Sequence, residues 1–194
     1  IYYLEKINPG TKVHHLPAAF RVKTHIRQDV LENALNFIIQ NQDSLRTAFV
    51  VENGLPVRKV FDHVDLKVDR YSINEELLTS SLQNASLLDF DLAAPPLFKI
   101  HIYDIGVNDC VLFILAHHAI WDGWSFDIFF DHLDKTYAHF NKALEPSDEF
   151  KPIKQYSEFI NYQEKYFLSE QYKTDKMFWQ DQLGLSLPVL EFPA

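Results

Sequence analysis

A run of apolar residues covers positions 111–116, and two histidines follow it directly. The run is too short to cross a membrane, and it has the length of a strand that is buried on both faces. Asp122 and Gly123 interrupt the apolar pattern, and a helical period begins at Trp124. The pattern therefore predicts a buried strand, a turn, and a helix over about residues 124–139. The positions expected to face inward on this helix are Ile128, Phe129, Leu133 and Tyr137.

The remaining apolar positions predict strands and helices in alternation. Strands are expected at 18–23 and 98–103, and a hairpin is expected at 48–60, where Asn53-Gly54 is a strong turn signal. Helices are expected at about 29–41, 74–88, 156–166 and 171–183. Asp29 has the position of an N-cap. The buried residues expected on the first two helices are Leu31, Ala34, Leu35 and Ile38, and Leu77, Leu78, Leu82, Ala85 and Leu88. This order predicts an α/β fold, a mixed sheet with helices packed on it.

Composition limits the classes of function. The 194 residues are 47% hydrophobic, which is enough for a core, and the formal net charge is −9. Such a charge disfavours nucleic acid and anionic membranes as partners. The single cysteine, Cys110, is expected to be a small core residue of a cytoplasmic protein. No stretch predicts a membrane span or a leader, and a chain that starts at Ile1 instead of Met is expected to be a piece of a longer polypeptide.

The histidines are the candidate catalytic residues. Imidazole titrates near neutrality, so His118 at the end of a rigid strand can accept a proton. Asp122 can orient that ring, cap the following helix, or pair with a cation elsewhere. Gly123 is expected where the chain turns from strand to helix, with an N–H that can approach a developing oxyanion. Histidines are numerous, but their spacing predicts no metal site.

Four segments resemble, in order, motifs of the condensation domains of nonribosomal peptide synthetases. Residues 117–125 read His-His-x-x-x-Asp-Gly-Trp-Ser and resemble the core motif, and residues 45–49 read Leu-Arg-Thr-Ala-Phe and resemble the second motif. Residues 156–162 resemble the fourth motif, with glutamate and tyrosine in place of aspartate and tryptophan. Residues 178–183 resemble the helix that closes the family's first half. Near the second motif, Gln42 stands where histidine is common.

This resemblance implies a fold like that of chloramphenicol acetyltransferase, built of two lobes with the active site between them. By this resemblance, residues 1–194 are expected to be the N-terminal subdomain, without the C-terminal subdomain. The resemblance makes His118 catalytic and implies that Asp122 pairs with Arg46. His117 is expected to serve packing and loop geometry, and Trp124 and Ser125 are expected to start and pack the helix instead of contacting substrate.

The implied reaction joins a donor acyl or peptidyl thioester to an acceptor aminoacyl thioester through an amide bond. No cofactor is expected to bind directly, because phosphopantetheine arms of carrier domains hold both substrates. The expected partners are the carrier domains, the C-terminal condensation lobe and a neighbouring adenylation domain, and the fragment is expected to be inactive alone. Alternatives are a silent lobe that docks carrier domains, or an acyltransferase that uses a soluble thioester. An epimerisation domain fits Trp124-Ser125 less well, and a heterocyclisation domain would have aspartate at His117.

Overall fold

The computed structural model describes residues 1–142, 154–184 and 189. The chain divides into two compact units, Ile1–Ile153 and Lys154–Ala194. The polar, proline-bearing segment at residues 145–154, whose sequence predicts a connection, lies almost wholly outside the described residues. None of the described helices combines the length and the apolar character that crossing a membrane requires.

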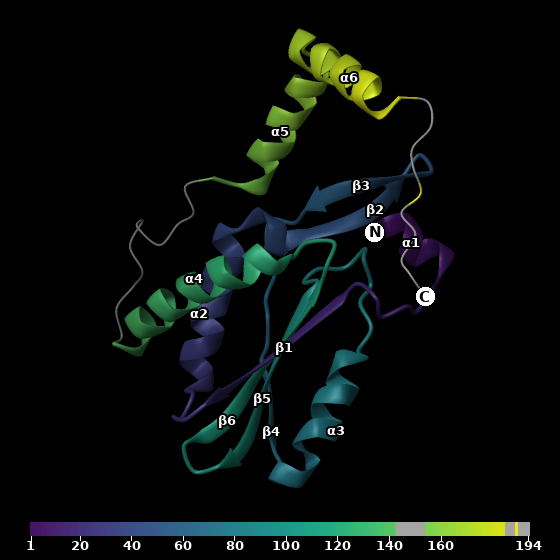
Figure 1. The fold of residues 1–194 in the computed structure, drawn as a ribbon. Helices are drawn as coiled ribbons and strands as arrows, with labels where there is room; N and C mark the ends of the chain where they lie inside the picture. The colour runs from purple at the N-terminus through teal and green to yellow at the C-terminus, as the bar shows by residue number, and fades with distance from the viewer. Residues whose placement is uncertain (143–153, 185–188, 190–194) are drawn as a thin grey trace. The chain divides into compact units, whose positions relative to one another are not determined.

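A four-stranded mixed sheet organises the first unit, with the strand order β1-β6-β5-β4 (Figure 1). Strand β6 (Asp109–His117) is antiparallel to both of its neighbours, β1 (His15–Val22) and β5 (Phe98–Gly106). Strand β4 (Asp69–Ser72) runs parallel to β5 at the edge. The predicted mixed sheet is therefore confirmed. Strand β4 was missed, because four residues without a run of apolar positions carry too weak a pattern.

Helices cover both faces of this sheet (Figure 1). Helices α2 (Gln28–Asn41) and α4 (Gly123–Asn141) pack on one face, where the even-numbered apolar positions of β5 and β6 point. Helix α3 (Glu75–Ser86) packs on the other face, over the odd-numbered ones. Strand β6 is buried along the predicted run, with every residue of 111–116 no more than 7% exposed. A strand that is apolar on both sides is thus explained by helices on both sides.

A separate hairpin, helix α1 (Tyr2–Ile7) and a 3-10 turn, η1 (Asp43–Arg46), complete the first unit. The hairpin consists of β2 (Thr47–Glu52) and β3 (Leu55–Val60). Its turn places Asn53 at φ 51° and Gly54 at φ 80°, the left-handed conformation that Asn-Gly favours. The predicted hairpin is confirmed.

The structure corrects several details of the helices. Asp29 is not the N-cap of α2; the helix begins at Gln28 with Arg27 as its cap residue. Leu77 and Leu88, predicted to be buried, are 53% and 37% exposed, and Ile128 on α4 is 54% exposed. A helical period identifies the apolar stripe but not its edges, because the tertiary neighbours decide how wide a stripe is covered.

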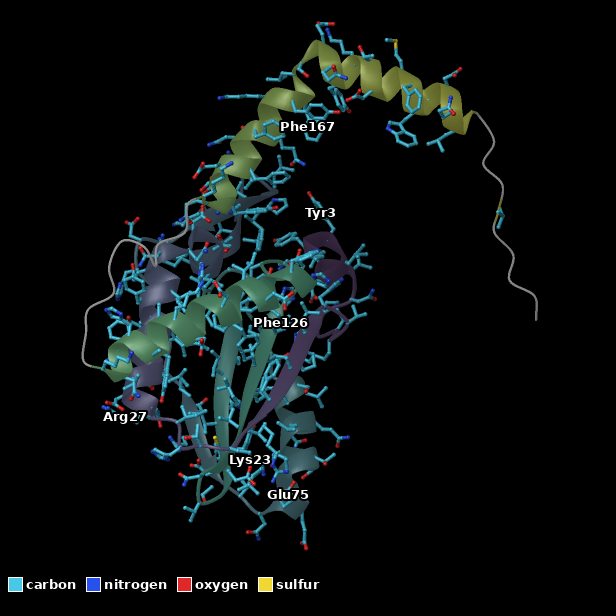
Figure 2. The ribbon with its side chains drawn as sticks, turned by 60° about the vertical axis from the view of Figure 1, so that its left-hand side comes forward. Tyr3, Lys23, Arg27, Glu75, Phe126 and Phe167 are labelled. Carbon is cyan, nitrogen blue, oxygen red and sulfur yellow. The ribbon has the colours of Figure 1, made fainter. Side chains whose placement is uncertain are left out.

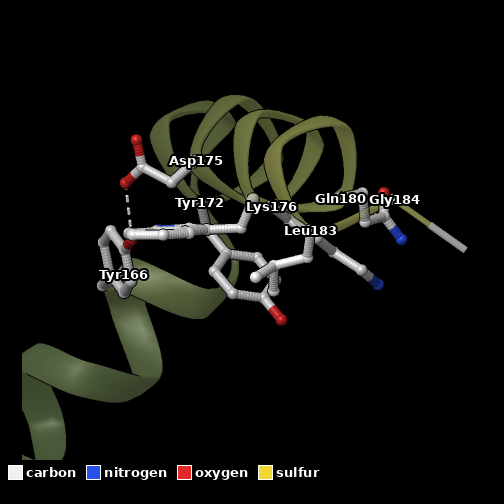
Figure 3. Close-up of a pocket in the computed structure, with 8 residues that line it drawn as sticks. Tyr166, Tyr172, Asp175, Lys176, Gln180, Leu183 and Gly184 are labelled. Atoms are coloured by element: carbon white, nitrogen blue, oxygen red, sulfur yellow. Dashed lines mark hydrogen bonds between the residues drawn. The ribbon is translucent and has the colours of Figure 1, made fainter. Parts of the chain in front are cut away.

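The second unit is a pair of helices, α5 (Tyr156–Phe167) and α6 (Glu170–Leu183), close to their predicted positions. Neither helix buries a residue, and apolar side chains such as Phe167 stay exposed (Figure 2). A cavity of about 460 Å³ lies at the bend, where the Tyr166 hydroxyl donates to Asp175 over 2.6 Å (Figure 3). That hydrogen bond raises the pKa of Tyr166.

Candidate functional site

His118 lies just beyond the end of β6, and its side chain is exposed. Its backbone N–H donates to the His14 carbonyl over 2.8 Å, which continues the contact between the ends of β1 and β6. Within residues 1–142, 154–184 and 189, no hydrogen bond holds its imidazole. His118 therefore has a fixed backbone and an imidazole that is free to meet another molecule, as a general base requires.

Asp122 is the N-cap of α4 and forms a reciprocal capping box with Ser125. Its Oδ1 accepts from the Ser125 N–H over 2.9 Å and from the Ser125 hydroxyl over 2.7 Å. The hydrogen bond from the Ser125 hydroxyl, then that from its N–H, lowers the pKa of Asp122, and the nearby His118 acts in the same direction. Of the alternatives left open by the sequence, the structure therefore supports the helix cap. The role predicted for Ser125, starting the helix, is confirmed.

The ion pair predicted between Asp122 and Arg46 is wrong. The Arg46 guanidinium instead donates to two backbone carbonyls, that of Ile39 over 3.0 Å and that of Phe61. The Phe61 N–H in turn donates to the Arg46 carbonyl over 2.9 Å. Arg46 thus joins the end of α2 to the chain that follows the hairpin. The sequence motif indicates that an arginine is needed there, but backbone carbonyls can accept its hydrogen bonds just as a carboxylate can.

Gly123 and Trp124 also differ from expectation. Gly123 is the first residue of α4, its φ lies outside the left-handed region, and a Cβ there would meet no atom within 4 Å. The turn therefore does not require glycine, contrary to the prediction. Trp124 was expected to pack against the fold, but its side chain is 77% exposed. The buried tryptophan is Trp121, 3% exposed and in contact with Phe98 and Phe129.

His117 is buried, 1% exposed, and its tautomer follows from its neighbours. The Ala119 N–H donates to His117 Nδ1 over 3.1 Å, so in the neutral ring the proton is on Nε2. That nitrogen lies 3.4 Å from Oε1 of Glu5. Burial lowers the pKa of His117, although the Glu5 carboxylate acts in the opposite direction. The predicted role in loop geometry agrees with these contacts.

Glu5 and His14 belong to the site and were missed in the sequence. The same Oε1 of Glu5 accepts from His14 Nδ1 over 2.7 Å. Burial opposes ionisation of Glu5, but the hydrogen bond with His14 and the interactions with His117 outweigh it and lower its pKa. The sequence places no acidic residue at helical spacing from the histidine pair at 14–15, and this contact instead runs between α1 and the start of β1. No periodicity marks such a contact.

Two cavities of the first unit lie near the sheet. One, of about 330 Å³, has Glu5 and Phe90 among its lining residues, and Phe90 also contacts the His117 ring. The other, of about 670 Å³, lies between the far end of β1, α2 and the second half of α4. Among the described residues, no group of three or more His, Cys, Asp or Glu side chains is arranged to hold a metal ion. The site is therefore built of histidines, the carboxylates of Glu5 and Asp122, and a helix N-terminus.

A family model described as Condensation domain matches residues 1–194. The chain belongs to the condensation domain family. Its similarity to a linear gramicidin synthase of Brevibacillus parabrevis is 29% identity over 203 residues, which cover all of this chain and 4% of that protein. Bacitracin synthase 3 of Bacillus licheniformis is 29% identical over 194 residues, all of this chain and 3% of that protein. The chain thus spans a small fraction of these nonribosomal peptide synthetases, and family membership extends to the condensation domain alone.

Solved structures give the same fold. The starter condensation domain of the rhizomide synthetase RzmA superposes with a TM-score of 0.85 at 15% identity, over 98% of this chain and 48% of that one. The X-domain from teicoplanin biosynthesis, in a complex with OxyB, superposes with a TM-score of 0.87 at 20% identity, over 99% of this chain and 43% of that one. The fold expected from the sequence is confirmed.

Proposed function

We propose that this chain is the first of two lobes of a condensation domain in a nonribosomal peptide synthetase, and that it contributes His118 to amide bond formation. The observation that carries the proposal is the exposed His118 imidazole at the end of a buried strand, inside the family's core motif. The chain matches the condensation family over its full length and covers 48% of a solved condensation domain, which supports its assignment to one lobe.

In the proposed reaction, the amine of the acceptor aminoacyl thioester attacks the carbonyl carbon of the donor thioester. A C–N bond forms, the C–S bond breaks, and the amine loses a proton while the leaving sulfur gains one. His118 takes the proton from the amine or holds the amine in line by a hydrogen bond. Either role needs an imidazole that the fold does not occupy, and the His118 side chain meets that need.

Asp122 and Gly123 support this step from the start of α4. Asp122 fixes the first turn of α4 through its capping box, directly after the loop that carries His118. The first N–H groups of a helix have no partner within the helix, so the Gly123 N–H can donate to the oxyanion that forms on the donor carbonyl. The open space around Gly123 allows a thioester to come close to the backbone.

The other expectations follow from the same assignment and stay predictions. Carrier domains would present both substrates on phosphopantetheine arms, so the chain itself would bind no cofactor. The second lobe would supply the opposite wall of the site, and the 194-residue chain alone is predicted to be inactive. A neighbouring adenylation domain and a cytoplasmic location are likewise predicted.

Two alternatives lead to different experimental results. A silent lobe that docks carrier domains would leave product formation insensitive to His118. An acyltransferase that uses soluble thioesters would turn over a small-molecule thioester as readily as a carrier-bound one.

The test uses the full-length synthetase that contains this chain, with loaded donor and acceptor carriers, in single turnover. Loss of a general base is expected to slow His118→Ala by about 10²–10⁴-fold. The control is His25→Ala, which removes another exposed histidine at the opposite end of β1. His25→Ala should keep the wild-type rate. A folded His118→Ala variant that forms product at the wild-type rate would contradict the assignment.

A further inference from the structure

Glu5 differs from most of helix α1, in which Tyr2 is the other half-buried residue. Among the described residues, α1 buries no side chain, and its apolar residues Tyr3, Leu4 and Ile7 are 53–71% exposed. The Glu5 side chain is only 16% exposed. Its contacts lie at the end of the sheet where β1 and β6 meet. This helix therefore contacts the end of the sheet through the carboxylate of Glu5, although α1 also carries apolar side chains.

One oxygen of Glu5 faces two imidazoles. Oε1 accepts from Nδ1 of His14 over 2.7 Å and lies 3.4 Å from Nε2 of His117. The His117 proton is on Nε2, because the Ala119 N–H occupies Nδ1. Since an ionised carboxylate only accepts, His14 must be the donor in its hydrogen bond with Glu5. His14 thus donates to this oxygen, and the protonated Nε2 of His117 lies within ion-pair distance of it, so one carboxylate contacts both rings.

Both residues connect to His118 through the backbone. His14 accepts the His118 N–H with its carbonyl, over 2.8 Å. His117 is the preceding residue, and its buried ring also contacts the rings of His14 and His15 at centroid distances of 6.2 Å and 5.9 Å. The backbone of His118 is therefore held by two residues whose side chains share one carboxylate oxygen.

We propose that Glu5 is a positioning residue for the condensation reaction: its carboxylate orients the His14 and His117 rings and thereby fixes the backbone that carries the His118 imidazole. The inference rests on the proposed function. Glu5 does not touch the reacting atoms in this scheme; it acts through its two histidine partners. Because a displacement of about 1 Å in a reacting group can cost about 100-fold in rate, a support of this kind acts on the chemical step.

The experiment compares Glu5→Ala and Glu5→Gln in the full-length synthetase, in single turnover at a series of acceptor-carrier concentrations. Glu5→Ala removes the acceptor oxygen and should lower the maximal rate by about 100-fold while the half-saturating carrier concentration stays the same. Glu5→Gln keeps an acceptor oxygen without the charge, and its maximal rate should lie between those of Glu5→Ala and the wild type. Glu76→Gln makes the same change on an exposed residue of α3 and should leave the rate unaltered.

Each outcome decides for or against the inference. A wild-type rate in folded Glu5→Ala overturns it, and so does a Glu5→Gln rate no higher than that of Glu5→Ala. A change confined to the half-saturating concentration assigns Glu5 to carrier binding instead and overturns it as well. If Glu5→Ala does not fold, Glu5→Gln decides alone, and a wild-type rate overturns the inference. His118→Ala, measured in parallel, tests the proposed function separately: if it is inactive while both Glu5 variants are fully active, only the inference fails.

Discussion

The two ends of the β1–β6 pair carry polar clusters of different construction. At the Val22–Cys110 end, Arg21 donates to both Asp109 and Glu75, and Lys23 contacts Asp109 over 2.8 Å. Figure 2 shows Lys23 and Glu75 at this end of the first unit, and Tyr3 on α1 toward the other. Here every named charge is paired with an opposite charge, and most of these side chains are exposed to solvent.

At the His15–His117 end the pairing is incomplete. Glu5 contacts both His14 and His117, and His117 is buried. The adjoining His118 keeps an exposed imidazole without a hydrogen bond from the described residues. Under the proposed function, the first cluster only stabilises the end of the sheet, whereas the second presents a reactive group. In a structural cluster every polar side chain has a partner. In a functional cluster the neighbours hold one residue in place and leave its side chain free to meet another molecule.

The largest effect on stability is expected for His117→Ala, at the end with the buried ring. Truncation of a ring that is 1% exposed leaves a cavity and removes a partner of the Glu5 carboxylate. We expect a loss of about 3 kcal/mol in the free energy of unfolding. Urea unfolding of the 194-residue chain, followed by the fluorescence of buried Trp121, measures it. His63→Ala, at a side chain 68% exposed, is the control. A loss no larger than that of the control would contradict the assignment of His117 to the core.

An intermediate effect is expected for Arg46→Ala and Asp122→Ala. Arg46→Ala removes the donor to the Phe61 carbonyl and one of two donors to the Ile39 carbonyl, which keeps the Gln42 N–H, and should cost about 1–3 kcal/mol. Asp122→Ala removes a helix cap and should cost about 1 kcal/mol. Because the two residues have no partner in common, the double variant should be additive within about 0.5 kcal/mol. Urea unfolding of the wild type, the two single variants and the double variant provides the measurement. A coupling energy above this limit would indicate an ion pair between Arg46 and Asp122 and would contradict the structure.

The smallest effect is expected for Arg21→Ala at the opposite end. Ion pairs at the surface contribute little, so the melting temperature should fall less than in Asp122→Ala. Hydrogen bonds from Arg21 and Lys23 hold the pKa of the Asp109 carboxyl well below its usual range. This contribution is present above the unfolded pKa of about 3.9 and is lost as the pH falls through the lower folded pKa.

The difference between wild type and Arg21→Ala should therefore be largest near neutral pH and shrink in acid. It should also shrink at about 1 M salt, where the screening length is about 3 Å. Thermal melts over pH and salt provide the test. A difference that grows in acid would mean that Asp109 is not stabilised as an anion at this end of the sheet.

The sequence by itself determined most of the helices and strands and the location of the candidate site. The apolar run at 111–116 predicted β6 as a strand buried on both faces, and the spacing of Leu31, Ala34, Leu35 and Ile38 predicted the buried face of α2. Asn53-Gly54 predicted the hairpin turn. These features depend on neighbours a few residues apart, so the local pattern contains them. The motif at 117–125 likewise predicted where a strand ends in titratable groups.

Only the tertiary structure decided which residues contact one another at that site. In the structure, Glu5 contacts His14 and His117, and Arg46 donates to two backbone carbonyls. Asp122 caps α4, and Trp124 is exposed. The tertiary structure also added the short parallel strand β4 to the edge of the sheet. In these cases more than one partner or environment was compatible with the residue type. A carboxylate or a guanidinium can satisfy its hydrogen bonds with many groups, and the packing of distant elements selects among them.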